Sequence, residues 1–442
     1  MRIRFWGTRG SIATPGPSTN HFGGNTTCIE LTTRAGQLLI FDMGTGARLL
    51  GADLLSRSQA PIRGNILLTH THWDHIQGFP FFAPLFLAGN EFAVYAPEGG
   101  GGSLHQLLAG QMEFRYFPVD LHQLPAAITY HDLAEGTHEI GGVRVLAQFL
   151  HHPAMTLGYR VEADSATVVV LTDHEPFAET FWRSDTEPGR VESILHDGDR
   201  RHARFMAGAD LVIHDAQYTP EEYPKKKTWG HSTFEYVVEL AAAAGVRRLA
   251  LTHHDPTHSD DMVAEIEGRA RELAQRLNSS IDVSCAYEGW DIAVEGHDTN
   301  AAAGIAEIAP AATFAAARIL VTDDDQDVRA LTKRALERDG HSVIEATSGA
   351  EALRLVQEQR PDMLVLDLVM PDIGGLEVLD ALRARPESSA LPILILTSMD
   401  DEGSTRAGFE RGATDYLTKP FSMPQLAARV RSILARVSEQ RA

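Results

Sequence analysis

The pattern of apolar and polar residues changes along the chain and divides it into two parts. After residue 317, short apolar runs alternate with amphipathic stretches, as in RILVT (318–322) followed by DVRALTKRALER (327–338). Strands and helices that alternate at this spacing predict a doubly wound domain with a five-stranded parallel sheet, a (βα)5 arrangement. Before residue 298, short apolar runs come in hairpin-like pairs, and helical patterns separate only the later ones. We expect an α/β fold of a different kind there.

The stretch between these two parts is typical of a linker. Residues 298–316 are DTNAAAGIAEIAPAATFAA, a small-residue tract without an amphipathic stripe. A short Ala-rich helix packed on one domain is the alternative, and it leaves the boundary unchanged. A chain of 442 residues also exceeds the roughly 250–300 residues at which single cores stop growing. We therefore predict domains at 1–297 and 317–442.

Hydropathy and cysteine content bear on the compartment. The chain has no uninterrupted apolar run of the length that spans a membrane, and its N-terminus lacks the apolar core of a signal peptide. Only Cys28 and Cys285 are present, without zinc-ribbon spacing, so we expect plain buried thiols in a reducing compartment. These features predict a cytoplasmic protein without a membrane partner.

Charge and histidine are unevenly distributed. The net charge of −21 divides into −16 for residues 1–316 and −5 for residues 317–442, and nineteen of the twenty histidines precede residue 317. An acidic domain repels polyanions at long range, which favours small substrates over structured RNA. Any imidazole chemistry therefore belongs to the first domain.

The sequence THTHWDH (69–75) has the highest density of imidazole and carboxylate side chains in this domain. It follows the apolar run NILL, and other apolar runs of this domain also end in His or Asp. Imidazoles and carboxylates gathered at one rim would repel one another or leave donors unpaired unless a cation held them. A solvated histidine-rich loop is the alternative. A pair of divalent ions is the better interpretation.

THTHWDH resembles the signature of the metallo-β-lactamase fold hydrolases, and the similarity extends over residues 1–297. The resemblance implies an αββα sandwich with two metals, for which N and O ligands suit zinc, manganese or iron. His151 and His254 remain alternatives to their neighbours as ligands. The implied ligands are His70, His72 and His152 for metal one, Asp173 as the bridge, and Asp74, His75 and His253 for metal two.

Two further stretches resemble the phosphodiesterase branch of that superfamily, which includes tRNA 3′-processing endonucleases and cyclic-phosphate phosphodiesterases. They are DLVIHDAQYT (210–219) and WGHSTF (229–234). Asp215 stands where the branch usually has Glu. The resemblance implies catalytic roles for Asp74, His231 and His214, with His231 donating to phosphate or to the leaving oxygen and His214 with Asp215 orienting it. His231 could also simply precede a helix capped by Ser232 or Thr233.

The glycines and lysines near these motifs have two interpretations each. Gly23, Gly24, Gly44 and Gly46 either let backbone pass close beneath the site or are ordinary turn residues. The lysines of PKKKTW (224–229) form either a solvated surface run or a rim that attracts phosphate.

Residues 317–437 resemble a response-regulator receiver. The resemblance implies Mg²⁺ at Asp323, Asp324 and Asp367, with Asp367 as phosphoacceptor and a sensor histidine kinase as phosphodonor. Lys419 would pair with the phosphoryl oxygens, and Thr397 with Tyr416 would form the switch. No DNA-binding helix pair follows, so we expect the hydrolase to be the output and no DNA partner. Control could act through turnover or through assembly, for example as a homodimer.

The resulting functional prediction is a two-component response regulator whose output is a dinuclear hydrolase. The most favoured substrate is a small phosphodiester such as a cyclic nucleotide. A thioester or lactone hydrolase, an RNA-processing nuclease and a non-catalytic di-iron sensor are the alternatives.

Overall fold

The computed structural model describes most of the chain, in two compact units, Met1–Pro310 and Ala311–Ala442. The linker predicted at 298–316 lies almost wholly outside the described residues, as does much of the last receiver helix expected from residue 425 onward. The described residues are 1–97, 103–177, 182, 189–277, 279–296, 316–371, 373–398, 411–419, 421, 423, 426, 427, 429–431, 433 and 434.

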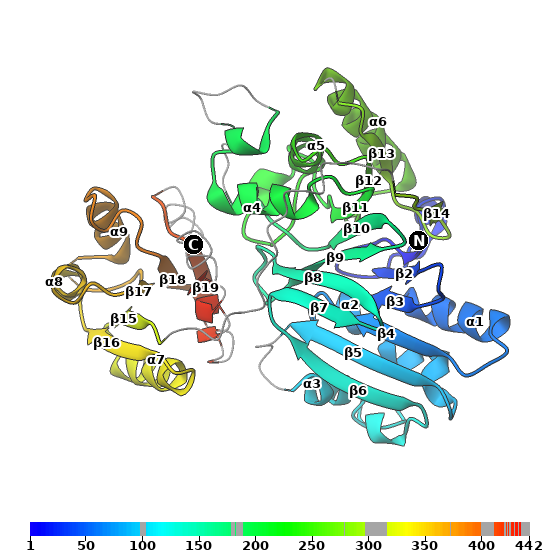
Figure 1. Ribbon diagram of the computed structural model, residues 1–442, viewed down its shortest axis with the longest axis horizontal. Coiled ribbons are helices and arrows are strands. Elements are labelled where there is room, and N and C mark those ends of the chain that lie inside the picture. The colour runs from blue at the N-terminus through cyan, green and yellow to red at the C-terminus, as the bar shows by residue number, and fades with distance from the viewer. Residues whose placement is uncertain are drawn as a thin grey trace. The chain divides into compact units, whose positions relative to one another are not determined.

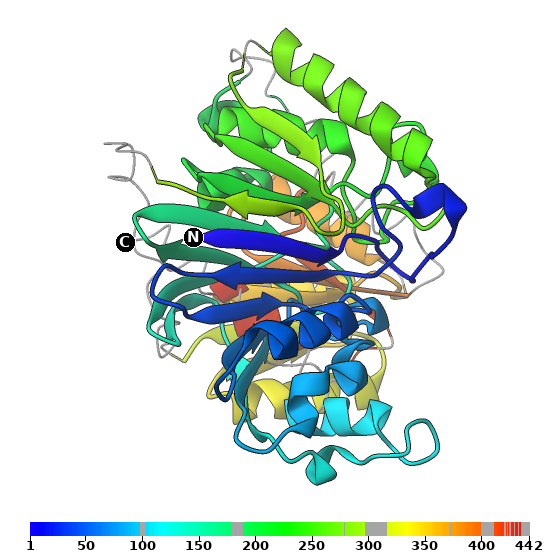
Figure 2. The same cartoon turned by 90° about the vertical axis from the view of Figure 1, so that its right-hand side faces the viewer.

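Two seven-stranded sheets form the centre of the first unit (Figures 1 and 2). In spatial order, the first sheet contains β14 (Asp291–Ala293), β1 (Arg2–Gly7), β2 (Cys28–Thr32), β3 (Leu38–Phe41), β4 (Arg63–Leu67), β5 (Glu91–Pro97) and β6 (Ala127–Leu133). The second sheet contains β13 (Asp282–Cys285), β12 (Arg248–Thr252), β11 (Leu211–Asp215), β10 (Ala166–Leu171), β9 (Leu157–Ala163), β8 (Val143–Phe149) and β7 (Gly136–Ile140).

The sheets face each other across one hydrophobic core. Phe5 and Phe41 from the first sheet pack in the same buried cluster as Tyr159, Val168 and Ile213 from the second. The central strands are buried on both faces, which explains why their sequences read as continuous apolar runs rather than as alternating ones.

Helices cover the outer face of each sheet (Figure 2). Residues of α1 (Ala47–Arg57) and α3 (Leu104–Gln111) belong to the core outside the first sheet, and residues of α4 (Asp197–Met206), α5 (Phe234–Ala243) and α6 (Asp260–Arg276) to the core outside the second. The predicted αββα sandwich is confirmed. Shorter elements are α2 (Trp73–Ile76) and the 3-10 turns η1 (Pro17–Thr19), η2 (Phe79–Phe81), η3 (Ala83–Phe86), η4 (Leu121–Gln123), η5 (Val191–Ser193) and η6 (Tyr223–Lys225).

The second unit has one parallel sheet of five strands in the order β16-β15-β17-β18-β19, which confirms the predicted (βα)5 architecture. A core lies on each face of this sheet. Its elements are β15 (Arg318–Thr322), α7 (Gln326–Arg338), β16 (Ser342–Ala346), α8 (Gly349–Gln359), β17 (Met363–Asp367), α9 (Gly375–Arg383), β18 (Ile393–Ser398) and β19 (Asp415–Lys419).

In the part of the chain that the structure describes, no helix combines the length and the apolar character that crossing a membrane requires.

Candidate metal centre

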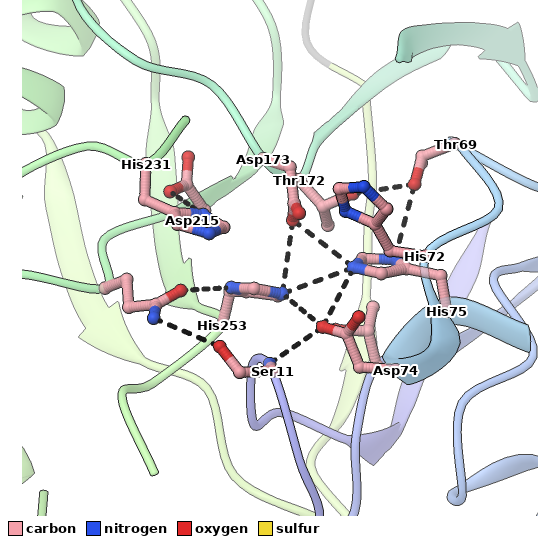
Figure 3. A network of polar contacts seen from close by, with 12 residues as sticks. Ser11, Thr69, His72, Asp74, His75, Thr172, Asp173, Asp215, His231 and His253 are labelled. Atoms are coloured by element: carbon pink, nitrogen blue, oxygen red, sulfur yellow. Dashed lines mark hydrogen bonds and ion pairs between the residues drawn. The ribbon is translucent and has the colours of Figure 1, made fainter. Parts of the chain in front are cut away.

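The carboxyl ends of four strands, β4, β8, β10 and β12, bring the predicted ligands to one rim of the sandwich (Figure 3). His70 and His72 follow β4, and Asp74 and His75 lie in α2, which starts at Trp73. Asp173 follows β10, in the second sheet. Because residues 72–75 pass from extended backbone into a helical turn, the histidines and the aspartate project in different directions from one short segment.

Two groups of side chains share this rim. The first contains His70, His72, His152 and Asp173, and their nearest ligand atoms all lie within 4.8 Å of one another. His152 Nε2 is 3.2 Å from His72 Nδ1, and His70 Nε2 is 3.4 Å from Asp173 Oδ2. This composition, three imidazoles and one carboxylate, can surround a single divalent ion.

The second group contains Asp74, His75 and His253. Their atoms face one another closely, with 3.3 Å between the Nε2 atoms of His75 and His253 and 3.2 Å from His253 Nε2 to Asp74 Oδ2. Asp173 joins the two groups, because its other oxygen, Oδ1, is 3.1 Å from His253 Nε2 and 3.4 Å from His75 Nε2. All seven residues predicted as ligands therefore meet around one carboxylate.

Neighbouring polar groups hold the rings of this centre in place. Asp42 Oδ2 lies 2.8 Å from Nδ1 of His75, and the backbone oxygen of Gly230 lies 2.9 Å from Nδ1 of His152. The amide oxygen of Gln217 is 2.9 Å from Nδ1 of His253. With oxygen acceptors at Nδ1, each ring in its neutral form keeps its proton there and presents the Nε2 lone pair to the centre.

Two alternatives left open by the sequence differ clearly in position. Nδ1 of His151 lies 2.8 Å from the backbone oxygen of Glu175, and the ring stacks on Phe177. Nε2 of His254 lies 2.9 Å from the backbone oxygen of Ala286. Neither residue belongs to the two groups, so we retain His152 and His253 as the proposed ligands.

Three residues of the centre have backbones in the left-handed region. The φ angles are +58° for Asp42, +61° for Asp173 and +60° for His253. Non-glycine residues rarely adopt such angles, and the conformation costs on the order of 1 kcal/mol or more at each position. The surrounding sandwich holds these backbones where their side chains converge.

Charge in the centre favours ionised carboxylates among mostly neutral imidazoles. Burial alone would raise the pKa of Asp173, but surrounding imidazoles, His253 first, hold it well below its usual range. Burial lowers the pKa of His70 well below its usual range and the pKa of His152 to about 3. His75 differs, because neighbouring carboxylates, Asp74 first, overcome burial and raise its pKa well above the usual value.

The donor atoms fit divalent cations. Nε2 of His70 and Oδ1 of Asp173 are buried, and neither has a hydrogen-bond partner among the residues that the structure describes. Buried polar atoms without such partners are costly, and a cation beside each of these two atoms would remove that cost. The arrangement of imidazole nitrogens and carboxylate oxygens suits zinc, manganese or iron.

His231 stands beside the centre, on the second sheet's side (Figure 3). Its ring stacks on that of His253 with 5.0 Å between centroids, and its Nδ1 is 3.5 Å from Oδ2 of Asp215. Burial favours the neutral ring, but Asp173 and Asp215 raise the pKa of His231 above its usual value. His231 can therefore carry a proton at the edge of the metal centre near neutral pH.

His214 lies behind Asp215 rather than at the centre. Its Nδ1 is 3.2 Å from Asp215 Oδ1, while Asp215 Oδ2 accepts the backbone N–H of Ser232 at 2.9 Å. His231 also precedes a helix, because Thr233 caps α5 by accepting the Tyr236 N–H. The capping and the catalytic interpretations of this segment are compatible.

Glycines allow close packing around the centre. Gly230 has a φ of +88°, and a Cβ there would lie 2.0 Å from Nδ1 of His152. A Cβ on Gly44 would lie 2.4 Å from the backbone oxygen of Asp74. Of the four glycines with two interpretations, Gly44 thus fits the close-approach one, and Gly230, which the sequence did not single out, is a second close approach.

The lysine run lies on the loop that precedes His231. Lys226 Nζ lies 4.2 Å from the ring centroid of Trp229, which is 53% exposed, and Lys225 is exposed. One lysine is thus held over an aromatic face beside the segment that leads to His231, and another extends into solvent.

The receiver site gathers its acidic groups at the ends of β15 and β17. Asp323, Asp324 and Asp367 have carboxylate oxygens within 4.8 Å of one another. Lys419 Nζ lies 2.9 Å from Asp323 and 3.1 Å from Asp367. Burial first, and then Asp323, raises the pKa of Asp367, although Lys419 opposes this shift.

The two residues predicted as the receiver switch lie on neighbouring strands. Thr397, near the end of β18, is 2% exposed, and Tyr416 of β19 is 7% exposed. Both are directed into the fold rather than into solvent in this conformation.

Several residues that orient ligands of this centre were given no role by the motifs read from the sequence, although Gln217 lies within DLVIHDAQYT (210–219). Asp42, Gln217 and the N–H of Ser11, which Asp74 Oδ2 accepts at 2.7 Å, all orient ligands. The sequence does contain a signal for Asp42, because it follows the apolar run LLIF in the way that Asp173 follows VVVL. Ser11 acts through its backbone, so its side-chain identity carries no signal.

Family models match both units. Residues 40–254 match the model of a beta-lactamase superfamily domain, and residues 319–431 match that of a response regulator receiver domain.

Individual proteins resemble one unit at a time. Response regulator MprA of Mycobacterium sp. (strain KMS) is 48% identical over 121 residues, which are 27% of this chain and 52% of that protein. The chain thus spans about half the length of the curated relatives it matches.

Two solved structures cover the other unit. The metallo-beta-lactamase fold protein YhfI from Bacillus subtilis is 16% identical over 66% of this chain and 99% of its own, with a TM-score of 0.46. The short form of human tRNase Z is 20% identical over 66% of this chain and 99% of its own, with a TM-score of 0.44.

Proposed function

Because this chain joins a beta-lactamase superfamily domain to a response regulator receiver domain, we propose that it is a phosphorylation-controlled, dinuclear metal-dependent hydrolase of small phosphodiesters. The observation that carries the proposal is Asp173, whose two oxygens face the two ligand groups while His231 stands alongside.

The proposed ligands would hold two divalent ions, the first at His70, His72, His152 and Asp173 and the second at Asp74, His75, His253 and Asp173. When bound, such a pair acidifies a water molecule and neutralises charge on the phosphate oxygens.

His231 is the proposed general acid. A phosphodiester loses an oxygen leaving group that needs a proton when it is an alkoxide. The raised pKa of His231 keeps a proton available, and Asp215, 3.5 Å from Nδ1, stabilises the cation. The Nε2–H of His231 is then the group that can reach the departing oxygen.

Asp74 is the proposed proton acceptor for the attacking water. Its Oδ2 already accepts the N–H of Ser11 and faces His253 Nε2 at 3.2 Å, so the carboxylate is held in one orientation. Burial alone would raise its pKa, but His75 and His253 keep the pKa of Asp74 well below its usual range. It is ionised at neutral pH and able to accept a proton.

The receiver would control this chemistry from Asp367. A phosphoryl group on Asp367 adds roughly −1.5 to −2 charge next to Lys419, and a sensor histidine kinase is the proposed donor. The change would reach the hydrolase through turnover or through the assembly state, with homodimerisation as one route.

A substrate panel tests the chemistry. The purified full chain, loaded with Mn²⁺ or Zn²⁺, is assayed against bis(4-nitrophenyl) phosphate, cyclic nucleotides, pre-tRNA, a thioester and a lactone. We expect turnover of the small phosphodiesters and its loss in His231→Asn for the alkyl diesters. Turnover of the thioester or lactone alone would overturn the phosphodiesterase assignment. Cleavage of pre-tRNA alone would favour the RNA-processing alternative.

The regulatory part has its own test. Turnover and oligomeric state are compared with and without beryllofluoride, which mimics the phosphoryl group, in the wild type and in Asp367→Ala. We expect a change of about 5–150-fold in activity, the usual range of allosteric coupling, or a change of assembly state, in the wild type alone. Identical rates and identical assembly with the mimic would refute control by the receiver.

A further inference from the structure

His202 is a buried histidine that none of the motifs includes. It lies in α4, is 1% exposed, and places its Nε2 only 2.8 Å from Nε2 of His214. Through His214 it is linked to Asp215 and from there to His231. The contacts thus form a row of four side chains from the interior of the α4 layer to the edge of the metal centre.

Oxygen acceptors determine where the protons lie in this row. In the described part of the chain, Nδ1 of His214 faces two oxygens, the Asp215 backbone oxygen at 2.8 Å and Oδ1 at 3.2 Å, so this nitrogen must donate. Nε2 of a neutral His214 then has a lone pair. The Nε2–H of His202 must be the donor of the 2.8 Å hydrogen bond.

His202 itself is held neutral and in one orientation. Burial, and then the neighbouring His214, lowers the pKa of His202 well below its usual range. Its ring stacks on His174 with 3.7 Å between centroids and 5° between planes. His174 in turn faces Tyr236 Oη at 3.3 Å, and Tyr236 donates to Asp199 of α4 at 2.7 Å. The helix that carries His202 is therefore fastened to the same cluster at a second point.

We propose that His202 is a positioning residue for the leaving-group proton. Its Nε2–H binds the lone pair of His214 Nε2 and so holds the His214 ring with Nδ1–H turned toward Asp215. The other Asp215 oxygen, Oδ2, which also accepts the Ser232 N–H, then faces Nδ1 of His231. His231 thereby directs Nε2–H toward the metal centre. The inference rests on the proposed phosphodiesterase function. It adds His202 to the residues that position the proton for the leaving group.

Two substitutions separate positioning from packing. His202→Met keeps a similar volume but removes the donor, whereas His202→Gln keeps an N–H donor close to the position of Nε2. Each variant is assayed with a 3′,5′-cyclic nucleotide, or another alkyl diester that the wild type hydrolyses, and with bis(4-nitrophenyl) phosphate. Nitrophenolate leaves without a proton, whereas an alkoxide needs one.

We expect His202→Met to lower kcat for the alkyl diester by about 10–100-fold, less than the loss of a whole general acid. With bis(4-nitrophenyl) phosphate the rate should stay within about threefold, and His202→Gln should stay within about threefold on both substrates. Equal losses on both substrates in His202→Met would mean a merely structural role and would overturn the proposal.

A measurement without turnover keeps this inference separate from the proposed function. In the Zn²⁺-loaded full chain labelled with ¹⁵N-histidine, the His214 signals should report a protonated Nδ1 and an unprotonated Nε2. His202→Gln should preserve the His214 Nε2 signal, whereas His202→Met should shift it, because the lone pair of that nitrogen loses its hydrogen-bond donor. Protonated Nε2 on His214 in the wild type would refute the inference even if phosphodiesters are hydrolysed. If the expected pattern were found but no phosphodiester were hydrolysed, the hydrogen bond from His202 to His214 would be supported and the proposed phosphodiesterase function would be refuted.

Discussion

The two units place reactive groups at the ends of strands in the same way, yet they build different sites. The hydrolase rim combines five imidazoles with two carboxylates drawn from residues 70–253 and from two facing sheets. The receiver rim combines three carboxylates with one lysine, Lys419, on a single parallel sheet. Nitrogen-rich sites favour transition metals, whereas all-oxygen sites favour Mg²⁺.

The balance of charge differs as well. In the receiver, Lys419 already lies between Asp323 and Asp367, so the site has a cation of its own before any ion binds. In the hydrolase, the carboxylate of Asp173 faces imidazoles at 3.1–3.7 Å. From this comparison we expect the centre of the first unit to depend on bound metal ions, whereas the acidic site of the second unit has Lys419 as a cation even without Mg²⁺.

Metal removal should give the largest effect. The two units have separate cores, so we expect two thermal transitions. After chelation, Zn²⁺ or Mn²⁺ at 1,000 times its Kd should stabilise only the hydrolase transition, by about 4 kcal/mol, whereas Mg²⁺ at ten times its Kd should stabilise only the receiver, by about 1.4 kcal/mol. Calorimetry of the full chain measures both shifts. Asp323→Ala should abolish only the Mg²⁺ effect, and an unmoved hydrolase transition with Zn²⁺ would contradict the comparison.

Loss of one ligand comes next. His72 is an exposed member of the first group, so His72→Ala should remove a ligand without unfolding the sandwich. Phosphodiester turnover should fall by more than about 100-fold, because even partners outside the coordination shell contribute about 10–100-fold. Elemental analysis should find less than the wild-type metal content. His105→Ala, at an exposed histidine of α3, is the matched control. Full activity in His72→Ala would disprove the ligand set.

Asp215→Asn should lower the free energy of unfolding of the first unit, by less than metal removal does. Neighbouring His214 and His231 overcome the effect of burial and lower the pKa of Asp215 from 3.8 to about 2. A lowered folded-state pKa contributes stability that is present above pH 3.8 and is lost as the pH falls through about 2. We expect a loss of about 2 kcal/mol at pH 7, measured by urea unfolding of the hydrolase transition. The exposed Asp261→Asn serves as control, and an unchanged midpoint would refute the expected coupling.

Asp367→Asn should give the smallest effect and the opposite sign. The pKa of Asp367 is raised, so its ionised form costs the folded receiver stability at neutral pH, and that cost disappears as the pH falls below 3.8. The variant should therefore stabilise the receiver transition at pH 7 and lose this advantage in acid. Glu387→Gln, at an exposed position of the same unit, should show neither change. If Asp367→Asn destabilised the receiver transition at pH 7, the expected opposite effects of Asp215→Asn and Asp367→Asn would be refuted.

Local patterns predicted much of the fold. The apolar runs before His70, Asp173, Asp215 and His253 correspond to β4, β10, β11 and β12, because strands buried on both faces need unbroken apolar sequence. Strands such as β6, whose residues alternate in exposure and include His131 and Asp132, were not singled out. Edge and partly exposed strands carry a weaker hydrophobic signal.

The sequence by itself determined that the imidazole-rich and the acidic sites lie in different parts of the chain, that the second unit has a parallel sheet, and that metal-ligating residues are dense in THTHWDH. These follow from periodicity and residue type, which act over a few positions. Only the tertiary structure decided which member of an adjacent pair enters the centre, as with His152 and His151, because neighbouring residues point in different directions. It alone brought His202 to His214, since a histidine within DRRHARF reads as part of a polar helix until α4 packs against β11.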